Sequence, residues 1–502
     1  MSKLFNQVSM SKPKKSLIDL SHEKKLTMNM GDLVPIMVQE CVPGDKFRVN
    51  TESLIRLAPM VAPAMHRVNA YIHYFFVPNR LLWDNWADFI TGGADGKAKP
   101  TMPYVYVGNT DSALVHTGSL ADYMGIPTAD SVTQGNGLIA LPFRAYQLIY
   151  NEYYRDQNLS QPVAITKNDG IINGSELLAT MQIRKRAWEK DYFTSALPWS
   201  QRGDEIELPN NLEYKPVTDT TNIVDYAGAA VTGSMTAQNG QIQVGSGVAS
   251  QIENIKSIGI TINDLRRSAR LQEFLEKTAR GGSRLTEVVK AFFGVTSSDA
   301  RLQRPEFIGG TKQPISISEV LATFNNTETA GATMYGHGIS VGNTKYVKKF
   351  CEEHGWLIGI MSVLPRTSYQ NSLPKQFLKF DKFDFYWPTF AQLGEQPVFD
   401  HEVFFDWTQN LDNMTTWGYQ SRYAEYKYQP STVHGDFRTS LSYWHLGRQF
   451  TTQPNLNESF VMSDPSQRIF ADTDAEHHHL WVQLYNDVKA IRPMPYFNNP
   501  IL

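Results

Sequence analysis

The stretch Arg67–Pro78, RVNAYIHYFFVP, decides the fold class of this chain. Apolar side chains occupy every second position from Val68 to Phe76, and the positions between them, from Arg67 to His73, are mostly polar. Alternation with a period of two over about ten residues is typical of a long strand with one buried face. Pro78 ends the pattern, because proline cannot donate to a strand ladder. The sequence therefore predicts a long, half-buried β-strand.

The sequence on both sides of this stretch is typical of a strand-rich protein. Its 34 glycines and 26 prolines are spread over 502 residues, as turns between many short strands require. Residues 31–80 and about 305–450 are interpreted as strands. Within the second region, Trp356–Leu364 is a continuous apolar run ended by Pro365, which predicts a strand buried on both faces. These features predict a sandwich or a jelly roll.

Helical spacing interrupts the strand pattern at three places. Aromatic and aliphatic residues recur at helical spacing in Phe143–Asp156. A second helix is expected from Asn263, as its N-cap, to the glycines at 281 and 282. A third is expected from a capping Ser283 to Gly294. The chain is therefore expected to be mainly β, with several helices in its long loops.

Two segments differ in composition from the rest of the chain. Residues 1–30 form a polar arm, and to residue 25 its six lysines outnumber its two carboxylates, Asp19 and Glu23, which gives +4. This arm is either a solvated terminus or a surface that faces nucleic acid or a neighbouring subunit. Residues 204–258 are rich in small and polar residues and poor in aromatic ones. They are interpreted as an inserted surface loop with weak β character.

The bulk composition excludes several classes of protein. The net charge is −3, whereas a protein that wraps nucleic acid by charge alone is strongly basic. Two cysteines, Cys41 and Cys351, are too few for a disulfide-stapled scaffold of this length. The segment Met1–Lys15 has no apolar core of a secretion signal. No apolar run is long enough for a membrane span.

Motifs of common enzymes are absent from the sequence: there is no phosphate-binding glycine loop, no Gly-x-Ser-x-Gly elbow and no His-Glu-x-x-His helix. The adjacent residues His477, His478 and His479 are the most conspicuous local feature. Consecutive side chains of a strand point to opposite faces and cannot all reach one metal ion, so interface or pH-responsive histidines are the better interpretation. We expect no enzyme activity, cofactor or metal. The aromatic content of 12% leaves a carbohydrate-active β-sandwich enzyme or lectin as the alternative.

Six segments, in order along the chain, resemble the major capsid proteins of the Microviridae, and most of all the gokushovirus branch. They are Leu54–Trp86 (LIRLAPMVAPAMHRVNAYIHYFFVPNRLLWDNW), Leu141–Asn158 (LPFRAYQLIYNEYYRDQN), Leu265–Gly294 (LRRSARLQEFLEKTARGGSRLTEVVKAFFG), Arg304–Ser318 (RPEFIGGTKQPISIS), Glu353–Tyr369 (EHGWLIGIMSVLPRTSY) and Gly418–Phe450 (GYQSRYAEYKYQPSTVHGDFRTSLSYWHLGRQF). Each segment alone is moderately specific, and six in order are a strong signal.

The resemblance implies an eight-stranded viral jelly roll with long loop insertions containing several helices. It also implies pentamers that assemble into an icosahedral bacteriophage shell enclosing circular single-stranded DNA, built in the bacterial host cytoplasm. The implied partners are an internal scaffolding protein, a small basic DNA-binding protein and a DNA pilot protein. A basic partner agrees with the nearly neutral shell, because most of the cations would then come from that partner.

The same resemblance implies a role for each of the two segments of unusual composition. Residues 1–30 become an interior arm of a capsid domain that spans 31–502, and the insertion 204–258 becomes a protrusion at the threefold axes that contacts a host surface receptor. The candidates for facing DNA are Lys12, Lys14, Lys15, Lys24 and Lys25.

Overall fold

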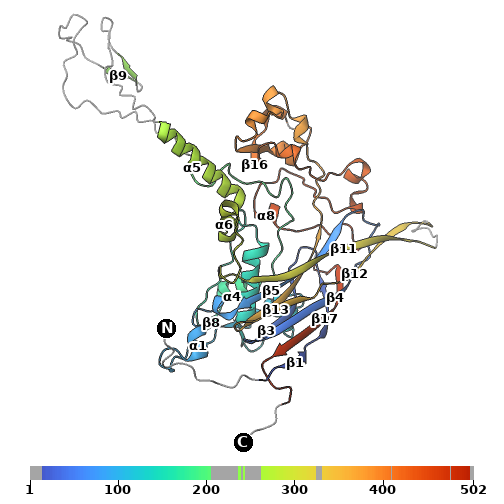
Figure 1. Ribbon diagram of the computed structural model, residues 1–502. Helices are drawn as coiled ribbons and strands as arrows, with labels where there is room; N and C mark the ends of the chain where they lie inside the picture. Colours follow the sequence, from blue (N-terminus) through green and yellow to red (C-terminus); the bar gives the residue numbers. More distant parts are fainter. Residues whose placement is uncertain are drawn as a thin grey trace, which may run out of the picture. The chain divides into compact units, whose positions relative to one another are not determined.

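The computed structural model describes residues 14–204, 262–323 and 331–497 except 409 and 475, together with the backbone of 236–238 and 241–243 (Figure 1). The chain divides into two compact units. One comprises residues 1–200 and 281–502, and the other comprises 201–280. The first unit contains the large β-sheet and all the surfaces discussed below.

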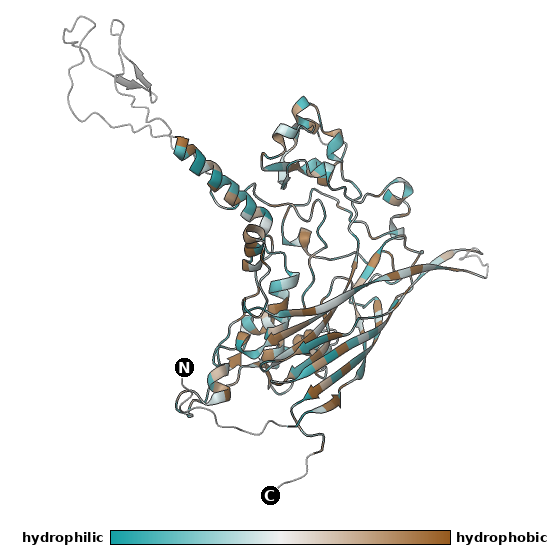
Figure 2. Cartoon of the chain, viewed as in Figure 1, coloured by the Kyte–Doolittle hydropathy of each residue, from teal (hydrophilic) through white to brown (hydrophobic). Residues whose placement is uncertain are grey.

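A large antiparallel sheet organises the first unit. Its strands follow the order β1 (Ser16–Asp19), β17 (Leu480–Arg492), β4 (Lys46–Leu57), β12 (Met334–Asn343), β11 (Glu306–Leu321), β5 (Val68–Pro78), β14 (Gly355–Pro365) and β3 (Val34–Cys41), while β2 (His22–Met28) also pairs with β17 and β13 (Val347–Phe350) also pairs with β4. Polar and apolar residues alternate along the strands (Figure 2). Non-consecutive strands are therefore neighbours, so the chain crosses repeatedly between the two ends of the sheet.

The sheet curls around one hydrophobic core. The long strand β11 pairs with β5 through residues 306–315 and with β12 through residues 316–321, so it passes from one half of the sheet to the other. As a result, Phe76 and Leu357 from one half lie in the same buried cluster as Leu57 and Val482 from the other. This curled sheet confirms the predicted mainly β jelly roll.

The strand that decides the fold class is present, but the prediction that it is half-buried was wrong. Strand β5 is buried on both faces. Phe76 points into the core inside the curled sheet, and Phe75 belongs to a second core on the other side of the strand. Helix α3 (Leu141–Ile149) and the turn of π-helix that follows it, Tyr150–Tyr154, supply much of that second core. The prediction was wrong because Tyr and His side chains, although partly polar, can be buried when a helix packs over them.

The other local predictions of the sequence were mostly confirmed. Strand β14 is buried on both faces, as its continuous apolar run predicted. Helices α5 (Ile262–Gly281) and α6 (Leu285–Phe293) lie where helical spacing placed them, but Asn263, the predicted N-cap of the first, lies inside α5. The predicted cap of α6 was wrong by one residue, because the Ser283 hydroxyl donates to Gln157 Oε1 at 2.9 Å and Arg284 occupies the N-cap position.

Strands do not continue to residue 450 as expected. After β14, the described chain up to that position forms only the strands β15 (Glu395–Phe399) and β16 (Thr416–Ser421), joined by loops and single helical turns. A third, smaller core packs Tyr369 and Phe193 against Val398 and Phe460. The stretch 380–390, which lies within the region interpreted as strands, instead contains the 3₁₀ turns Lys382–Asp384 and Pro388–Phe390. Its rings are mostly exposed, so it lacks the alternating burial of a strand.

The remaining elements are short. They are α1 (Trp86–Thr91), β6 (Tyr104–Val107), α2 (Leu120–Tyr123), β7 (Asn136–Ile139), β8 (Ile171–Ile172), α4 (Gly174–Met181), α7 (Asp400–Val403), α8 (Glu458–Val461) and the 3₁₀ turns Asn79–Leu81, Ser112–Val115, Lys375–Phe377, Leu411–Asn413, Ala424–Tyr426, Gly435–Arg438 and Ser442–Trp444.

The second unit contains most of α5 and a two-stranded ribbon. Strand β9 (Thr236–Gln238) pairs antiparallel with β10 (Gln241–Gln243). The helix is mainly hydrophilic (Figure 2). Apart from this ribbon and Asp204, the insertion predicted at 204–258 lies outside the described residues.

Candidate nucleic-acid and assembly surfaces

The lysines expected to face DNA take different environments. Residues 16–19 and 22–28 of the expected arm are strands of the large sheet, paired along β17. Lys12 lies outside the described residues, and Lys14 is exposed. Lys15 Nζ donates to the carbonyl of Gly44 at 3.2 Å. The described part of the arm from residue 16 onward is therefore anchored by backbone pairing.

Lys24 and Lys25 point in opposite directions because they are adjacent on β2. Lys24 Nζ donates to the carbonyls of Pro35, at 3.0 Å, and of Tyr123. Burial lowers the pKa of Lys24 to about 8. Lys25 is 74% exposed, with Glu23 at 3.6 Å. Lys25 is thus available to a ligand, whereas the Lys24 ammonium makes contacts within the protein. The DNA-facing role of the five lysines stays a prediction.

The three adjacent histidines have three separate sets of partners. His477 Nδ1 lies 2.6 Å from Asp472 Oδ2, and this hydrogen bond raises the pKa of the exposed His477. His478 Nδ1 lies 2.8 Å from Thr27 Oγ1, and burial lowers its pKa. His479 is buried and stacks on Phe470, with 4.6 Å between ring centroids. The rings do not converge, and the described residues contain no cluster of three metal-ligating side chains.

A cavity of about 670 Å³ lies over the face of β2, β17 and β4, and sequence reasoning missed it. Its lining includes Lys25, Arg56 and Trp481. Exposed and buried residues alternate along β17, so Trp481 is on the outward face of a strand. The alternation in LWVQLYNDVKAIR was a usable signal for this strand, but only the pairing of distant strands brings the cations to the indole.

A second surface is formed by exposed aromatic residues between 377 and 428, called here the aromatic surface. Its members are Phe377, Phe380, Phe383, Phe385, Tyr386, Trp387, Trp407, Tyr426 and Tyr428, each at least 48% exposed. Several of them line a cavity of about 1130 Å³. Exposed aromatic residues gathered in this way mark an interaction site.

Two buried ion pairs line the same cavity as the aromatic surface. Lys375 Nζ lies 3.1 Å from Glu402 Oε1, and Lys379 Nζ lies 3.1 Å from Glu425 Oε1. Burial, which is the largest effect, raises the pKa of Glu402. Glu425 also accepts from Gln396 Nε2 at 2.6 Å. Both carboxylates are therefore committed to internal partners.

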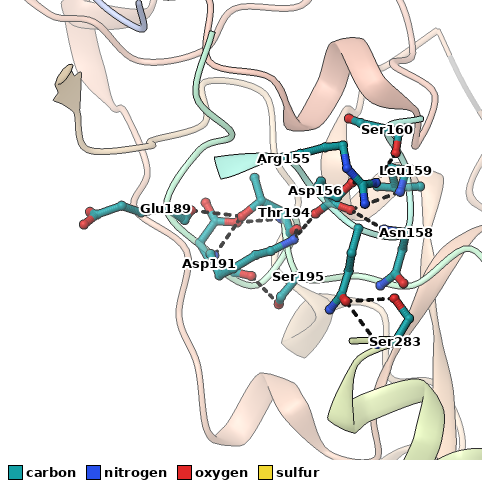
Figure 3. A network of polar contacts seen from close by, with 12 residues as sticks. Arg155, Asp156, Asn158, Leu159, Ser160, Glu189, Asp191, Thr194, Ser195 and Ser283 are labelled. Atoms are coloured by element: carbon teal, nitrogen blue, oxygen red, sulfur yellow. Dashed lines mark hydrogen bonds and ion pairs between the residues drawn. The ribbon is translucent and has the colours of Figure 1, made fainter. Parts of the chain in front are cut away.

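A polar network fixes the loop between α4 and the second unit (Figure 3). Asp191 Oδ1 accepts from the backbone amide of Thr194 at 2.7 Å, and Asp191 Oδ2 accepts from the hydroxyls of Thr367, at 2.6 Å, and Tyr369, at 2.8 Å. Lys190 pairs with the buried carboxylate of Asp156. These bonds connect the loop to the segment that follows β14, so their role is structural.

No helix within the described parts of the chain has both the length and the apolar character needed to cross a membrane.

Comparison with known proteins shows the family of this chain. A profile of the capsid protein (F protein) family matches residues 6–502. Capsid protein VP1 of Chlamydia phage 1 is 33% identical over 100% of this chain and 98% of its own length. The VP1 proteins of Bdellovibrio phage phiMH2K and Spiroplasma virus 4 are 34% and 28% identical, over 99% and 97% of this chain and over 97% and 95% of their own lengths.

These matches confirm the resemblance to the Microviridae and its gokushovirus branch that the six sequence segments carried. They extend through the jelly roll and through the loops that hold the aromatic surface and the histidines. With almost the whole length matched and two relatives above 30% identity, this chain belongs to the capsid protein (F protein) family.

Proposed function

We propose that this chain is the major capsid protein that self-assembles through pentamers into an icosahedral shell around circular single-stranded DNA. The observation that carries the proposal is the aromatic surface, which exposes nine large rings on a chain that already has three buried cores. Exposed rings on this scale are stabilised when a partner covers them. Permanent contacts between subunits bury about 2,000 Å² or more each.

Particle formation by a surface variant tests this proposal. Replacement of Phe380, Phe383 and Trp387 by Ser should abolish shells while leaving the circular dichroism spectrum unchanged, because all three rings are exposed. The matched control replaces Thr389 and Gln392, exposed polar neighbours, by Ser. Electron microscopy of cells that also make the scaffolding protein gives the readout. Normal shells from the aromatic variant would contradict the role of this surface.

The proposed partners follow from the charge of the chain. A net charge of −3 cannot neutralise a packaged genome, so a small basic DNA-binding protein supplies most of the cations. An internal scaffolding protein and a DNA pilot protein complete the assembly, which takes place in the bacterial cytoplasm and ends in the virion. Purified particles analysed by mass spectrometry should contain a basic protein. Particles that hold DNA and this chain alone would contradict the proposal.

Of the five lysines, Lys12, Lys14, Lys15 and Lys25 are proposed to face the packaged DNA from an interior arm, whereas the Lys24 ammonium donates to the carbonyls of Pro35 and Tyr123. Support comes from the exposure of Lys14 and Lys25. Replacement of Lys12, Lys14, Lys15 and Lys25 by Gln should lower the DNA content per particle. Lys24→Gln serves as the structural comparison, because it should lower thermal stability through the lost contacts with Pro35 and Tyr123. Unchanged DNA content in the quadruple variant would refute the arm's role.

The insertion 204–258 is proposed to form a protrusion at the threefold axes that binds the host surface receptor. It is supported by the assignment of residues 201–280 to a compact unit of their own. Particles that lack residues 215–255 should assemble and yet fail to adsorb to host cells. Particles that carry a single Gly-to-Ala substitution in the same segment, produced and purified in the same way, are the control. Normal adsorption of the deletion particles would exclude the role in attachment.

The alternative of a carbohydrate-active protein is favoured by one observation, the aromatic cavity whose lining includes Glu402 and Glu425. Each carboxylate is paired with a lysine, and Glu402 is 1% exposed, which favours a structural role over catalysis at a sugar. Binding to a glycan array by a monodisperse small species, with no particles formed, would support the alternative.

A further inference from the structure

The outward face of β17 carries two aromatic side chains with opposite electrostatic surroundings. Trp481 is 47% exposed, and its cross-strand neighbours are Thr27 on β2 and Arg56 on β4. Four residues later, Tyr485 is also exposed, and its neighbours at the same two positions are Glu23 and Glu52. The two rings therefore share a strand and a face, and they differ in the charge beside them.

The cavity over Trp481 is a cationic groove with an aromatic wall. Its volume is about 670 Å³, within the range of pockets that hold a small ligand. Three cationic residues line it, Lys24, Lys25 and Arg56, against one carboxylate, that of Asp122. Asp122 Oδ2 already accepts the backbone amide of Gly118 at 2.8 Å. Glu23 lies 3.6 Å from Lys25 Nζ, so three cations face two carboxylates and the net charge at the cavity is still positive. The exposed cations are Lys25 and Arg56.

The lining of this cavity also contains polar groups that can hydrogen-bond to the edge of a planar ligand. The Thr27 hydroxyl is positioned by His478, 2.8 Å away, and the Gln483 side chain lines the cavity between Lys25 and Leu54. A hydroxyl and an amide both donate and accept hydrogen bonds. An indole face beside two exposed cations is the combination used by surfaces that bind single-stranded nucleic acid, because bases stack on rings while phosphates pair with the cations.

We propose that this cavity binds one nucleotide of single-stranded DNA, with the base stacked on Trp481 and the phosphate paired with Arg56 and Lys25. The inference deepens the proposed function, since it rests on the shell's enclosing single-stranded DNA and names the place where the chain holds it. Stacking is tolerant of base identity, so one such site per subunit suits a genome of any sequence. Tyr485 is excluded as a second site because Glu23 and Glu52 repel phosphate.

Photochemical cross-linking tests the site directly. The full-length chain, purified unassembled, is irradiated with an oligothymidylate that contains 5-iododeoxyuridine, and the cross-linked residue is identified by mass spectrometry. The expected cross-link is on Trp481. In parallel, fluorescence anisotropy of a labelled oligothymidylate should show binding that is weakened about 10-fold or more in Trp481→Ala and largely retained in Trp481→Phe.

Two further variants test whether binding depends on the charge of the cavity and on the position of the ring. Arg56→Gln should weaken binding and reduce the slope of log K against log salt by about 0.7, because one phosphate contact is lost from a single strand. Tyr485→Ala removes an exposed ring from the same face of the same strand and should leave affinity unchanged. Wild-type affinity in Trp481→Ala, or cross-links confined to residues away from this cavity, would overturn the inference.

Particle formation is scored separately, so the two proposals can fail independently. If shells form normally and Trp481→Ala binds DNA as the wild type does, the DNA site is refuted and the shell function stands. A wild-type chain that never forms shells would remove the shell function, and the cross-link and the affinity series would still decide whether the cavity binds a single strand.

Discussion

Glu402 shows at the scale of one residue how the aromatic surface is held in place. Its carboxylate accepts from Lys375 Nζ at 3.1 Å, from the Tyr192 hydroxyl at 2.9 Å and from the backbone amide of Phe399 at 2.9 Å. A buried carboxylate is tolerated when such partners replace water. Removing it leaves a buried ammonium and a buried hydroxyl without this acceptor.

Glu402→Ala should therefore destabilise the chain by about 3–5 kcal/mol, the usual cost of breaking a buried ion pair. Chemical denaturation followed by tryptophan fluorescence measures the change. Arg270→Gln is the matched control, because Arg270 is 82% exposed in its pair with Glu273 and solvent screens such a pair, so its loss should change stability little. Equal effects of the two substitutions would contradict the structural role of Glu402.

Asp32 gives a pH dependence of stability. Burial raises the pKa of Asp32 to about 6, above its ordinary value of 3.8. A carboxyl with a raised folded-state pKa stabilises the fold below the unfolded pKa, and this contribution is lost as pH rises from about 4 to about 6. Asp32→Asn should remove this slope and make the chain about 3 kcal/mol more stable at pH 7, at about 1.4 kcal/mol per pKa unit. Melting temperatures measured between pH 4 and pH 7 check the prediction, and an unchanged slope would count against it.

At the scale of elements, β14 and β17 differ in how many faces they bury. Along β14, Leu357 belongs to the core inside the curled sheet and Ile358 to the core beneath α3. Along β17, only alternate residues, such as Leu484, are buried, whereas Gln483 is exposed. Helices cover the outer face of β14, and the cavity lies over the outer face of β17.

Alanine substitutions should reproduce this difference. Leu357→Ala and Ile358→Ala should each cost about 2–5 kcal/mol, because each leaves a cavity in a packed core. On β17, Leu484→Ala should cost a similar amount, while Gln483→Ala should change stability by about 0.5 kcal/mol or less. Denaturation midpoints of the four variants provide the measurement. A large loss in Gln483→Ala would mean that the outer face of β17 is covered.

At the scale of the whole molecule, the three cores and the insertion are separable. None of the described side chains in the three cores comes from residues 201–280. Replacement of 215–255 by a short Gly/Ser linker should therefore leave the melting temperature of the remaining chain nearly unchanged, as calorimetry would show. As a control, a deletion of similar length, 366–404, removes Tyr369, Val398 and Val403 from the third core and should prevent folding. Insoluble protein from the first deletion would contradict the separation.

Much of the local structure could be predicted from the sequence, because it depends on the periodicity of neighbouring residues. The period of two marked β5, the continuous apolar run marked β14, and helical spacing marked α3, α5 and α6. Six ordered segments were enough to identify the family. None of these inferences needs to know which strands pair.

The surfaces were decided by tertiary structure. The second buried face of β5 exists because α3 covers it, and no pattern within β5 contains that information. The sequence does not distinguish Lys24 from Lys25. In the structure, where β2 pairs with β17, Lys24 points inward and Lys25 points outward. Trp481 meets Thr27 and Arg56 only across strands more than 400 residues apart in the chain. Periodicity is a local property, whereas register between distant strands is set by how the whole core packs, and the candidate DNA site depends on that register.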